Sequence, residues 1–303
     1  MFYFGIVLPC PKVACFGSIH SMSTVDQFAS VFNAASQTAF QHQPRVLENA
    51  LVVTDLEPDA AEKYTESART FFGTVTGKWE TVHGGEFATV KELLNLVESR
   101  KPDLIVTYRH LHSEAWRWPY SLGEHLDVLI QESAPPVAIL PHPDREGVPE
   151  RALKNTDSVM AINSHLVGED ALVNQAAGLT AIGGTLHLTH VEDDAVFERY
   201  LDVISKIPEI DTDIARDTIQ EQLLREPAAY IVSCETALRE AGVDLKVVQH
   251  VTQGHRLEEY RSAIEDHQVD LVVLQGHDED QLAMNATAYT VAVELRTIPL
   301  LIV

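Results

Sequence analysis

The stretch DLVVLQG (270–276) decides the fold, together with its near-copy DLIVT (103–107) in the first half of the chain. Both are short runs of Val, Ile and Leu, the pattern of strands that are buried on both faces of a parallel sheet. Each half then ends on a proline-led apolar run, PVAIL (136–140) or PLLIV (299–303). The chain is therefore predicted to contain the same α/β unit twice.

A third pair of similar segments extends the repeat. LVVTDLE (51–57) resembles LHLTHVE (186–192) at an offset of 135 residues, whereas DLIVT and DLVVLQG are offset by 167. The difference predicts a net insertion of 32 residues in the second half, at about 201–232. The apolar residues of this segment favour a surface helix over a cap on a pocket, an extension of the domain interface or a cover for a small apolar ligand. The residues on its apolar face are Ile214, Ile219, Leu223 and Leu224.

Apolar runs and helical periodicity alternate along both halves. Strands are expected near 12–18, 50–55, 79–83, 103–108 and 136–140, and again near 157–163, 185–191, 245–250, 270–275 and 299–303. Helices are expected over 88–100 and 257–267, where apolar residues recur on one face. The polar, proline-rich segment 141–156 is predicted to link a first domain (1–140) to a second (157–303). In such parallel sheets, a pocket lies beyond the carboxyl ends of the strands.

Composition excludes several classes of partner. The 303 residues carry a formal net charge of -23, which argues against a broad nucleic-acid surface and against binding to an anionic membrane. No apolar run reaches the roughly 18–20 residues that span a bilayer, and the N-terminal MFYFGIVLPCPK lacks the features of a signal peptide. The three cysteines, Cys10, Cys15 and Cys234, form no metal or disulfide pattern. A cytoplasmic protein is expected.

These segments resemble the universal stress protein family in its tandem form. The resemblance is carried by DLVVLQG and PLLIV, by Gly254 before a predicted helix, and in the first half by SLGEH (121–125) and PPVAIL (135–140). It implies two tandem, open, parallel five-stranded sheets with helices on both faces, a Rossmann-like fold of the adenine nucleotide α-hydrolase type. It also implies that 136–140 and 299–303 pair antiparallel, so that the chain is an intrachain pseudo-dimer. A further homodimer through outer faces stays open.

Family members that bind ATP carry the pattern G-x2-G-x9-G-[ST] after the fourth strand and an Asp at the end of the first. Here Val273, Gly276 and Ala286 take the three glycine positions, Thr287 keeps the hydroxyl, and Asn163 stands for the Asp. The acidic loop HDED (277–280) opposes a triphosphate. The resemblance thus implies a modified nucleotide-type pocket in the second domain. Its candidate cofactor-binding residues are Asn163, Val191, Gly276, Ala286 and Thr287.

In the first half, no glycine of that pattern remains at 108–113, and the aromatic residues of WRWPY (116–120) are expected to fill the space for phosphates. They are also interpreted as an interface or lid cluster. A small basic island accompanies them and is interpreted either as charge pairing with the many acids or as an anion site. Its members are Arg109, His110, His112 and Arg117.

Histidines follow several strands of the second half, and strand ends share one edge of a parallel sheet. With nearby acids they could hold a divalent metal, although a rim of neutral histidines is the simpler interpretation. The histidines are His190, His250, His255 and His277, and the acids are Glu192, Asp193, Asp278 and Asp280. Neither a nucleophile elbow nor a P-loop is present in the sequence.

The leading hypothesis is therefore a non-enzymatic universal stress protein that acts as a stress-linked regulatory or ligand-sensing module. It assigns no catalytic residue and no metal, and its partner is a protein or a small-molecule ligand. One alternative is an ATP-binding member, using ATP or another adenine nucleotide, with slow hydrolysis or nucleotide switching. A second alternative is a metal-dependent hydrolase that uses the histidines of the second half.

Overall fold

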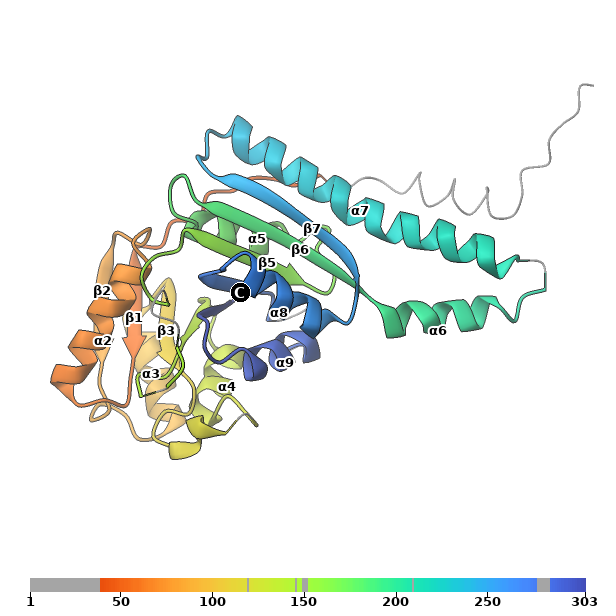
Figure 1. Ribbon diagram of the computed structural model, residues 1–303. Helices are drawn as coiled ribbons and strands as arrows, with labels where there is room; N and C mark the ends of the chain where they lie inside the picture. Colours follow the sequence, from red (N-terminus) through yellow and green to blue (C-terminus); the bar gives the residue numbers. More distant parts are fainter. Residues whose placement is uncertain (1–38, 119, 145, 149–151, 209, 277–283) are drawn as a thin grey trace, which may run out of the picture.

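The computed structural model describes residues 39–303 except 119, 145, 149–151, 209 and 277–283. Within these residues, nine strands form one continuous, mostly parallel sheet in the order β2-β1-β3-β4-β9-β8-β5-β6-β7 (Figure 1). The strands of the first half are β1 (Asn49–Val53), β2 (Lys78–Val82), β3 (Leu104–Tyr108) and β4 (Val137–Leu140). Those of the second are β5 (Ser158–Asn163), β6 (Thr185–Asp193), β7 (Lys246–Gly254), β8 (Leu271–Leu274) and β9 (Leu300–Ile302). The predicted α/β class is confirmed, and the strand expected near 12–18 lies outside the described residues.

The two halves join edge to edge through their last strands. β4 pairs antiparallel with β9, with Val137 opposite Ile302 and Ile139 opposite Leu300. Both strands are fully buried, so this pairing covers two apolar edges that would otherwise be free to template aggregation. The antiparallel pairing implied by the resemblance is therefore confirmed.

The pairing pattern corrects the alignment of the repeat. β1 lies between β2 and β3, as β5 lies between β6 and β8, so β1 corresponds to β5. Ala50 pairs with Leu104 and Val159 with Leu271, which makes Leu51 the counterpart of Met160 and not of Leu186. The predicted match of 51–57 with 186–192 is therefore wrong. Buried parallel strands all favour Val, Ile and Leu, so similarity between two of them does not establish that they are equivalent.

The correct alignment also enlarges the insertion. Ala50 and Val159 are equivalent residues of β1 and β5. Ala50 pairs with Trp79 of β2, and Val159 pairs with Leu186 of β6, so β2 corresponds to β6. The second half therefore has an edge strand, β7, with no counterpart among the described residues of the first half. The extra chain comprises α6 (Asp194–Ile204), α7 (Thr212–Glu240) and β7, and is longer than the predicted segment 201–232.

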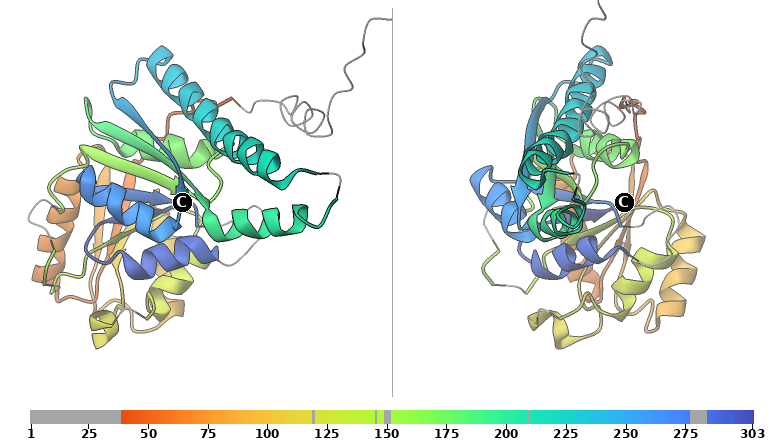
Figure 2. Two further views of the ribbon diagram at one scale, coloured as in Figure 1. Left: turned by 45° about the vertical axis from the view of Figure 1, so that its right-hand side comes forward. Right: turned by 90° about the vertical axis from the view of Figure 1, so that its right-hand side faces the viewer.

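Helices α6 and α7 form a hairpin that projects beyond the sheet (Figures 1 and 2). The last part of α7 packs on the sheet and buries Tyr230, Cys234 and Leu238, whereas Ile214 near its start is 55% exposed. Burial raises the pKa of the Cys234 thiol to about 12, so the thiol stays protonated at neutral pH. The helix predicted at 201–232 is thus exposed near the start of α7 and packed on the sheet near its end.

The remaining helices follow the apolar periodicity of the sequence. They are α2 (Pro58–Phe71), α3 (Val90–Arg100), the 3-10 helix η1 (Glu114–Arg117), α4 (Glu124–Glu132), α5 (Asp170–Leu179), α8 (Arg256–Asp266) and α9 (Ala286–Glu294). The helices predicted over 88–100 and 257–267 are confirmed as α3 and α8. Thr89 and Glu92 form a capping box at the start of α3. Seen along its edge, the sheet has α5 on one face and α8 on the other (Figure 2). Among the described residues, no helix combines the length and apolarity needed to cross a bilayer.

One aspartate in each half fastens the start of the central strand. Asp103 Oδ2 accepts the backbone N–H groups of Glu48 (3.1 Å) and Asn49 (3.0 Å) at the beginning of β1. Asp270 Oδ2 accepts the N–H of Ser158 at 2.9 Å at the beginning of β5. The same contact in both halves explains why the similar runs at 103–107 and 270–276 both begin with an aspartate.

The segment before β1 lies across the second half of the chain. Backbone N–H groups of Gln41 and Gln43 donate to the side chains of Asp170 (3.1 Å) and Asn174 (2.8 Å) of α5. The Phe40 ring packs edge-on against Tyr230 of α7, with 6.4 Å between ring centroids. Residues 39–43 therefore contact the second half although they precede the first strand. The domain limits at 140 and 157 stay a prediction.

Candidate functional site

The nucleotide-type position of the second half lies at the carboxyl ends of β5 and β8. Asn163 ends β5, Gly276 follows β8, and Thr287 stands in the first turn of α9. Asn163 and Thr287 line a common cavity with Tyr260, but its volume is only about 10 Å³. That is close to the lower limit for a single water molecule. Within the described residues, the structure brings Asn163 and Thr287 together and leaves space between them for no more than about one water molecule.

The side chain of Asn163 forms hydrogen bonds within the turn that follows β5. Its Nδ2 donates to the carbonyl oxygen of His165 at 3.0 Å, and its Oδ1 accepts the N–H of Ser164 at 2.7 Å. The residue is 9% exposed. An amide that is satisfied in this way holds the chain reversal after β5, which leaves it little capacity to bind a ligand.

Gly276 is required by the passage of β9. A Cβ atom at this position would stand 2.4 Å from Cγ2 of Ile302, inside contact distance. The Gly276 N–H donates to the carbonyl oxygen of Val303 at 2.9 Å, so this amide is already bonded. The surviving glycine of the ATP-type pattern therefore serves packing between the loop and β9 in this structure.

The start of α9 is fixed by a residue that the motif does not include. Asn285 Oδ1 accepts the N–H of Ala288 at 2.8 Å, and its Nδ2 donates to the carbonyl oxygen of Gln275 at 2.9 Å. This cap places Ala286 and Thr287 in the first helical turn. An Asn directly before an apolar helical run is a recognisable capping signal, and it could have been found in the sequence.

A larger cavity, of about 240 Å³, lies beside the filled one. Its lining comes from the beginning of α8, the beginning of α9 and the end of β6. The lining residues are Asp193, His255, Arg256, Leu257, Tyr260, Ala286, Thr287, Thr290 and Val291. Thr287 and Tyr260 therefore border both cavities. We refer to this space as the α8–α9 cavity.

Arg256 is the main charged residue of the α8–α9 cavity that the sequence interpretation missed. Its Nε donates to the carbonyl oxygen of Val191 at 3.1 Å, which anchors the guanidinium to the end of β6. Val191 itself is 1% exposed and contributes this carbonyl, not its side chain. Of the five predicted residues, Ala286 and Thr287 line the α8–α9 cavity, whereas Val191 only supports it.

Charges of both signs border the α8–α9 cavity. The starts of two helices carry a partial positive charge, Asn285 already accepts one N–H at the start of α9, and the first turn of α8 carries Glu258 and Glu259. The acid in the lining, Asp193, accepts the N–H groups of Ala195 (3.0 Å) and Val196 (3.1 Å) at the start of α6, which offsets its charge. Burial raises the pKa of Tyr260 to about 12, so its hydroxyl remains a hydrogen-bond donor at neutral pH.

The predicted metal set does not converge. Successive residues of a strand point to opposite faces, and directly paired residues of neighbouring strands point to the same face. His250 pairs with Thr189, so His190 lies on the face opposite to His250. His190 and His250 therefore do not converge, and the metal alternative cannot use them together. His255 stands at the start of α8, and the acidic loop with His277 lies outside the described residues.

The equivalent position of the first half is closed by a tyrosine. The Tyr108 hydroxyl at the end of β3 donates a short hydrogen bond to Asp55, whose other oxygen accepts the N–H of His112 at 2.7 Å. Burial, followed by the bonded Asp55, raises the pKa of Tyr108. Trp118 and Tyr120 are 60% and 81% exposed, so the prediction that these aromatics fill the phosphate space is wrong for them.

The predicted basic island separates in the structure. Arg109 is buried and donates to the carbonyl oxygens of Ala292 (2.7 and 3.1 Å) and Leu295 (2.9 Å) at the end of α9. Through these bonds it joins the two halves of the chain. Arg117 pairs with Glu114 at 2.7 Å on the surface, as the charge-pairing interpretation expects.

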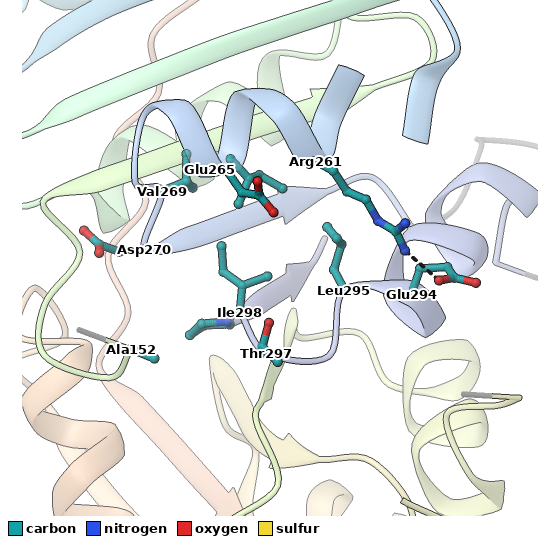
Figure 3. A pocket seen from close by; sticks show the side chains of 11 residues that line it. Ala152, Arg261, Glu265, Val269, Asp270, Glu294, Leu295, Thr297 and Ile298 are labelled. Atoms are coloured by element: carbon teal, nitrogen blue, oxygen red, sulfur yellow. Dashed lines mark hydrogen bonds and ion pairs between the residues drawn. The ribbon is translucent and has the colours of Figure 1, made fainter. Parts of the chain in front are cut away.

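A third cavity, of about 260 Å³, lies at the amino ends of β8 and β9 (Figure 3). It is bordered by α8 and by the end of α9, and an ion pair between Arg261 and Glu294 (2.7 Å) spans its rim. Ile264, Val269 and Ile298 supply apolar lining. Because it lies at the end of the sheet opposite to the usual ligand crevice of parallel α/β folds, we do not take it as the candidate site.

No protein-family profile matches the chain, and no curated protein sequence matches it. Solved structures with a similar fold include a universal stress protein from Archaeoglobus fulgidus, 14% identical over 84% of this chain and 85% of that one, with a TM-score of 0.46. A candidate universal stress protein from Pseudomonas aeruginosa is 12% identical over 85% and 93%, with a TM-score of 0.46. A functionally unknown protein from the same organism is 12% identical over 85% and 92%, with a TM-score of 0.45. At these scores the likeness adds nothing to the α/β class that the strand order already establishes.

Proposed function

We propose that this chain is a non-enzymatic ligand-sensing or regulatory module of the universal stress type, and that the α8–α9 cavity is its sensing site. The observation that carries the proposal is the pairing of a filled nucleotide-type position with an adjacent cavity of about 240 Å³ that is bordered by Arg256. The resemblance of DLVVLQG and PLLIV to the family supports the regulatory role. A cytoplasmic location remains part of this proposal.

The proposed ligand is a small anion of the phosphate or nucleotide type. A guanidinium binds phosphate and carboxylate oxygens through paired N–H groups, and the starts of α8 and α9 add further N–H donors. The volume lies below the roughly 300–1,000 Å³ of drug-sized sites, which favours a compact ligand. The net charge of -23 disfavours a polyanion, so a mobile small molecule is a better fit than nucleic acid.

The absence of turnover is proposed from the chemistry of the cavity lining. Among the described residues that line it, His255 supplies an imidazole and Asp193 a carboxylate. Asp193 already accepts two backbone N–H groups and therefore is poorly placed to act as a base. A catalytic site needs an acid, a base or a nucleophile in mutual contact, and this lining offers no such set within the described residues.

ATP binding remains the second candidate function. Thr287 favours it, because its hydroxyl stands in the first turn of α9, where the family pattern places a phosphate ligand. Against it stand the 10 Å³ volume beside Asn163 and the bonded amide of Gly276. A triphosphate that used the Gly276 N–H would have to displace the carbonyl oxygen of Val303 from it. The two candidate functions therefore differ in whether a bound nucleotide must widen the 10 Å³ space beside Asn163.

The experiment is a thermal-shift series with inorganic phosphate, pyrophosphate, AMP and ATP, followed by a phosphate-release assay with ATP. We expect at least one anion to raise the melting temperature of the wild type and Arg261→Gln but not of Arg256→Gln. Arg261 is the matched control because it stands on the same helix and pairs with Glu294, away from the α8–α9 cavity. Equal shifts in both variants would contradict the proposed site. Phosphate release that is lost in Thr287→Val would favour the ATP-dependent alternative.

A further inference from the structure

Three histidines from distant parts of the second half meet on the α8 face of the sheet. His187 lies on β6, His250 on β7, and His267 directly follows α8. One ring nitrogen of each lies within 4.8 Å of one nitrogen of each of the others. They are 63 and 17 residues apart in the chain, so no spacing in the sequence signals them. The pairing of β6 with β7 places His187 and His250 on one face.

The rings surround a common point. His187 Nδ1 and His250 Nε2 are 2.9 Å apart, and the ring centroids are separated by 5.2 Å (His187–His250), 5.0 Å (His187–His267) and 4.5 Å (His250–His267). A tetrahedral Zn²⁺ with Zn–N bonds of about 2.0–2.1 Å holds its ligand nitrogens about 3.4 Å apart. The His187–His250 separation lies below this value and the other two nitrogen pairs lie within 4.8 Å, so small ring rotations bring three nitrogens to ligand distance.

A serine orients the most buried of the three rings. Ser158 Oγ lies 3.2 Å from His187 Nε2 and 3.3 Å from the carbonyl oxygen of His267, to which it donates. With its proton directed to that carbonyl, Oγ accepts from His187 Nε2–H. This arrangement leaves the lone pair on Nδ1, which accepts a hydrogen bond from His250 Nε2–H at 2.9 Å. A bound metal would take the place of that proton, and His250 would then carry its proton on Nδ1. Metal-binding histidines characteristically use their other ring nitrogen for such a supporting bond.

We propose that His187, His250 and His267 form a binding site for a divalent transition metal of the Zn²⁺ class. Imidazole suits Zn²⁺, Ni²⁺ and Cu²⁺, and because His267 is exposed, a water molecule can take the remaining coordination position. Bound metal would fasten the end of α8 to the strands β6 and β7. His267 follows the end of α8, whereas the α8–α9 cavity lies at the beginning of α8 and the end of β6, so the metal site is separate from that cavity and does not depend on the proposed function.

The test uses the full chain without a histidine tag, after treatment with a chelator. Zn²⁺ is then added, and the bound metal and the melting temperature are measured for the wild type, His267→Gln and His255→Gln. His267 is exposed, so its substitution leaves the folded core intact, and His255 is an exposed histidine at the other end of α8. The wild type and His255→Gln should bind one equivalent of Zn²⁺ and melt at a higher temperature, because metal binding to the folded state stabilises it. In His267→Gln, the affinity should fall at least about tenfold.

Co²⁺ provides an independent readout of the ligands. A site with three imidazoles and a water should give the visible absorption bands of tetrahedral Co²⁺ in the wild type, and these bands should be lost in His267→Gln. If the wild type binds no Zn²⁺ and its melting temperature does not change, the proposal is wrong. Zn²⁺ binding that is equally tight in His267→Gln would overturn it as well, because the metal would then lie elsewhere on this acidic chain.

Discussion

Replacement of Arg109 by Met tests whether the two halves form one cooperative body. Arg109 follows β3 in the first half, yet its guanidinium donates to the carbonyl oxygens of Ala292 and Leu295 at the end of α9 in the second. The side chain is 4% exposed, so water cannot replace these bonds without rearrangement. Methionine preserves much of the volume but removes every donor.

The magnitude follows from the two carbonyl groups that lose their donor. A buried acceptor left without a hydrogen bond costs about 1–3 kcal/mol, which gives about 2–6 kcal/mol for the pair. The variant recovers part of this because it no longer buries a charge. We therefore expect the free energy of unfolding to fall by about 2–4 kcal/mol in Arg109→Met.

The assay is urea unfolding followed by both circular dichroism and tryptophan fluorescence. Arg117→Met is the matched control, because Arg117 is exposed and pairs with Glu114 on the surface, where such a pair contributes about 0–1 kcal/mol. The two probes should report one common transition for the wild type. A loss below about 1 kcal/mol in Arg109→Met, or a loss equal to that of the control, would refute the contact between the halves.

Three further predictions concern other contacts. Gly276→Ala should destabilise the fold by about 1–3 kcal/mol through its clash with Ile302, and the effect should shrink in an Ile302→Ala background, as a double-mutant cycle by urea unfolding would measure. The pKa of His187 is about 4 in the folded chain, below its ordinary 6.5, so protonation opposes folding. The free energy of unfolding should thus be steady above pH 6.5 and fall as the pH is lowered from 6.5 toward 4, which urea unfolding at a series of pH values would measure. If His187→Asn shows an equally steep fall, His187 is not responsible. Asp103→Ala should cost about 1–3 kcal/mol because two N–H groups at the start of β1 lose their acceptor, and Asp270→Ala should show a similar loss; no change in either would contradict the shared role.

Much of the fold could be predicted because buried strands and amphipathic helices leave a local trace. The runs at 103–107, 136–140, 270–276 and 299–303 are strands, and the two proline-led runs pair as expected. The identity of equivalent strands could not be predicted in the same way. Leu51 and Leu186 stand in similar apolar runs, and only the pairing partners reveal that Leu51 corresponds to Met160.

The candidate site could be predicted less well because it depends on contacts between distant segments. The family pattern singled out Gly276 and Thr287, but it could not show that Ile302 lies beside Gly276. Arg256 was missed because a single arginine after a strand has no distinctive spacing. Arg109 was grouped with its sequence neighbours in a basic island because its bonding partners lie more than 180 residues away in the chain.

The central claim is that the α8–α9 cavity binds a small anion through Arg256. Isothermal titration calorimetry of pyrophosphate, AMP and ATP against the wild type and Arg256→Gln tests it most directly. The loss of a charge-assisted contact of about 1.5–3 kcal/mol should weaken binding of at least one of these anions by about 10- to 100-fold in the variant. If none of them binds the wild type at millimolar concentration, or if the variant binds with the same affinity, the claim is contradicted.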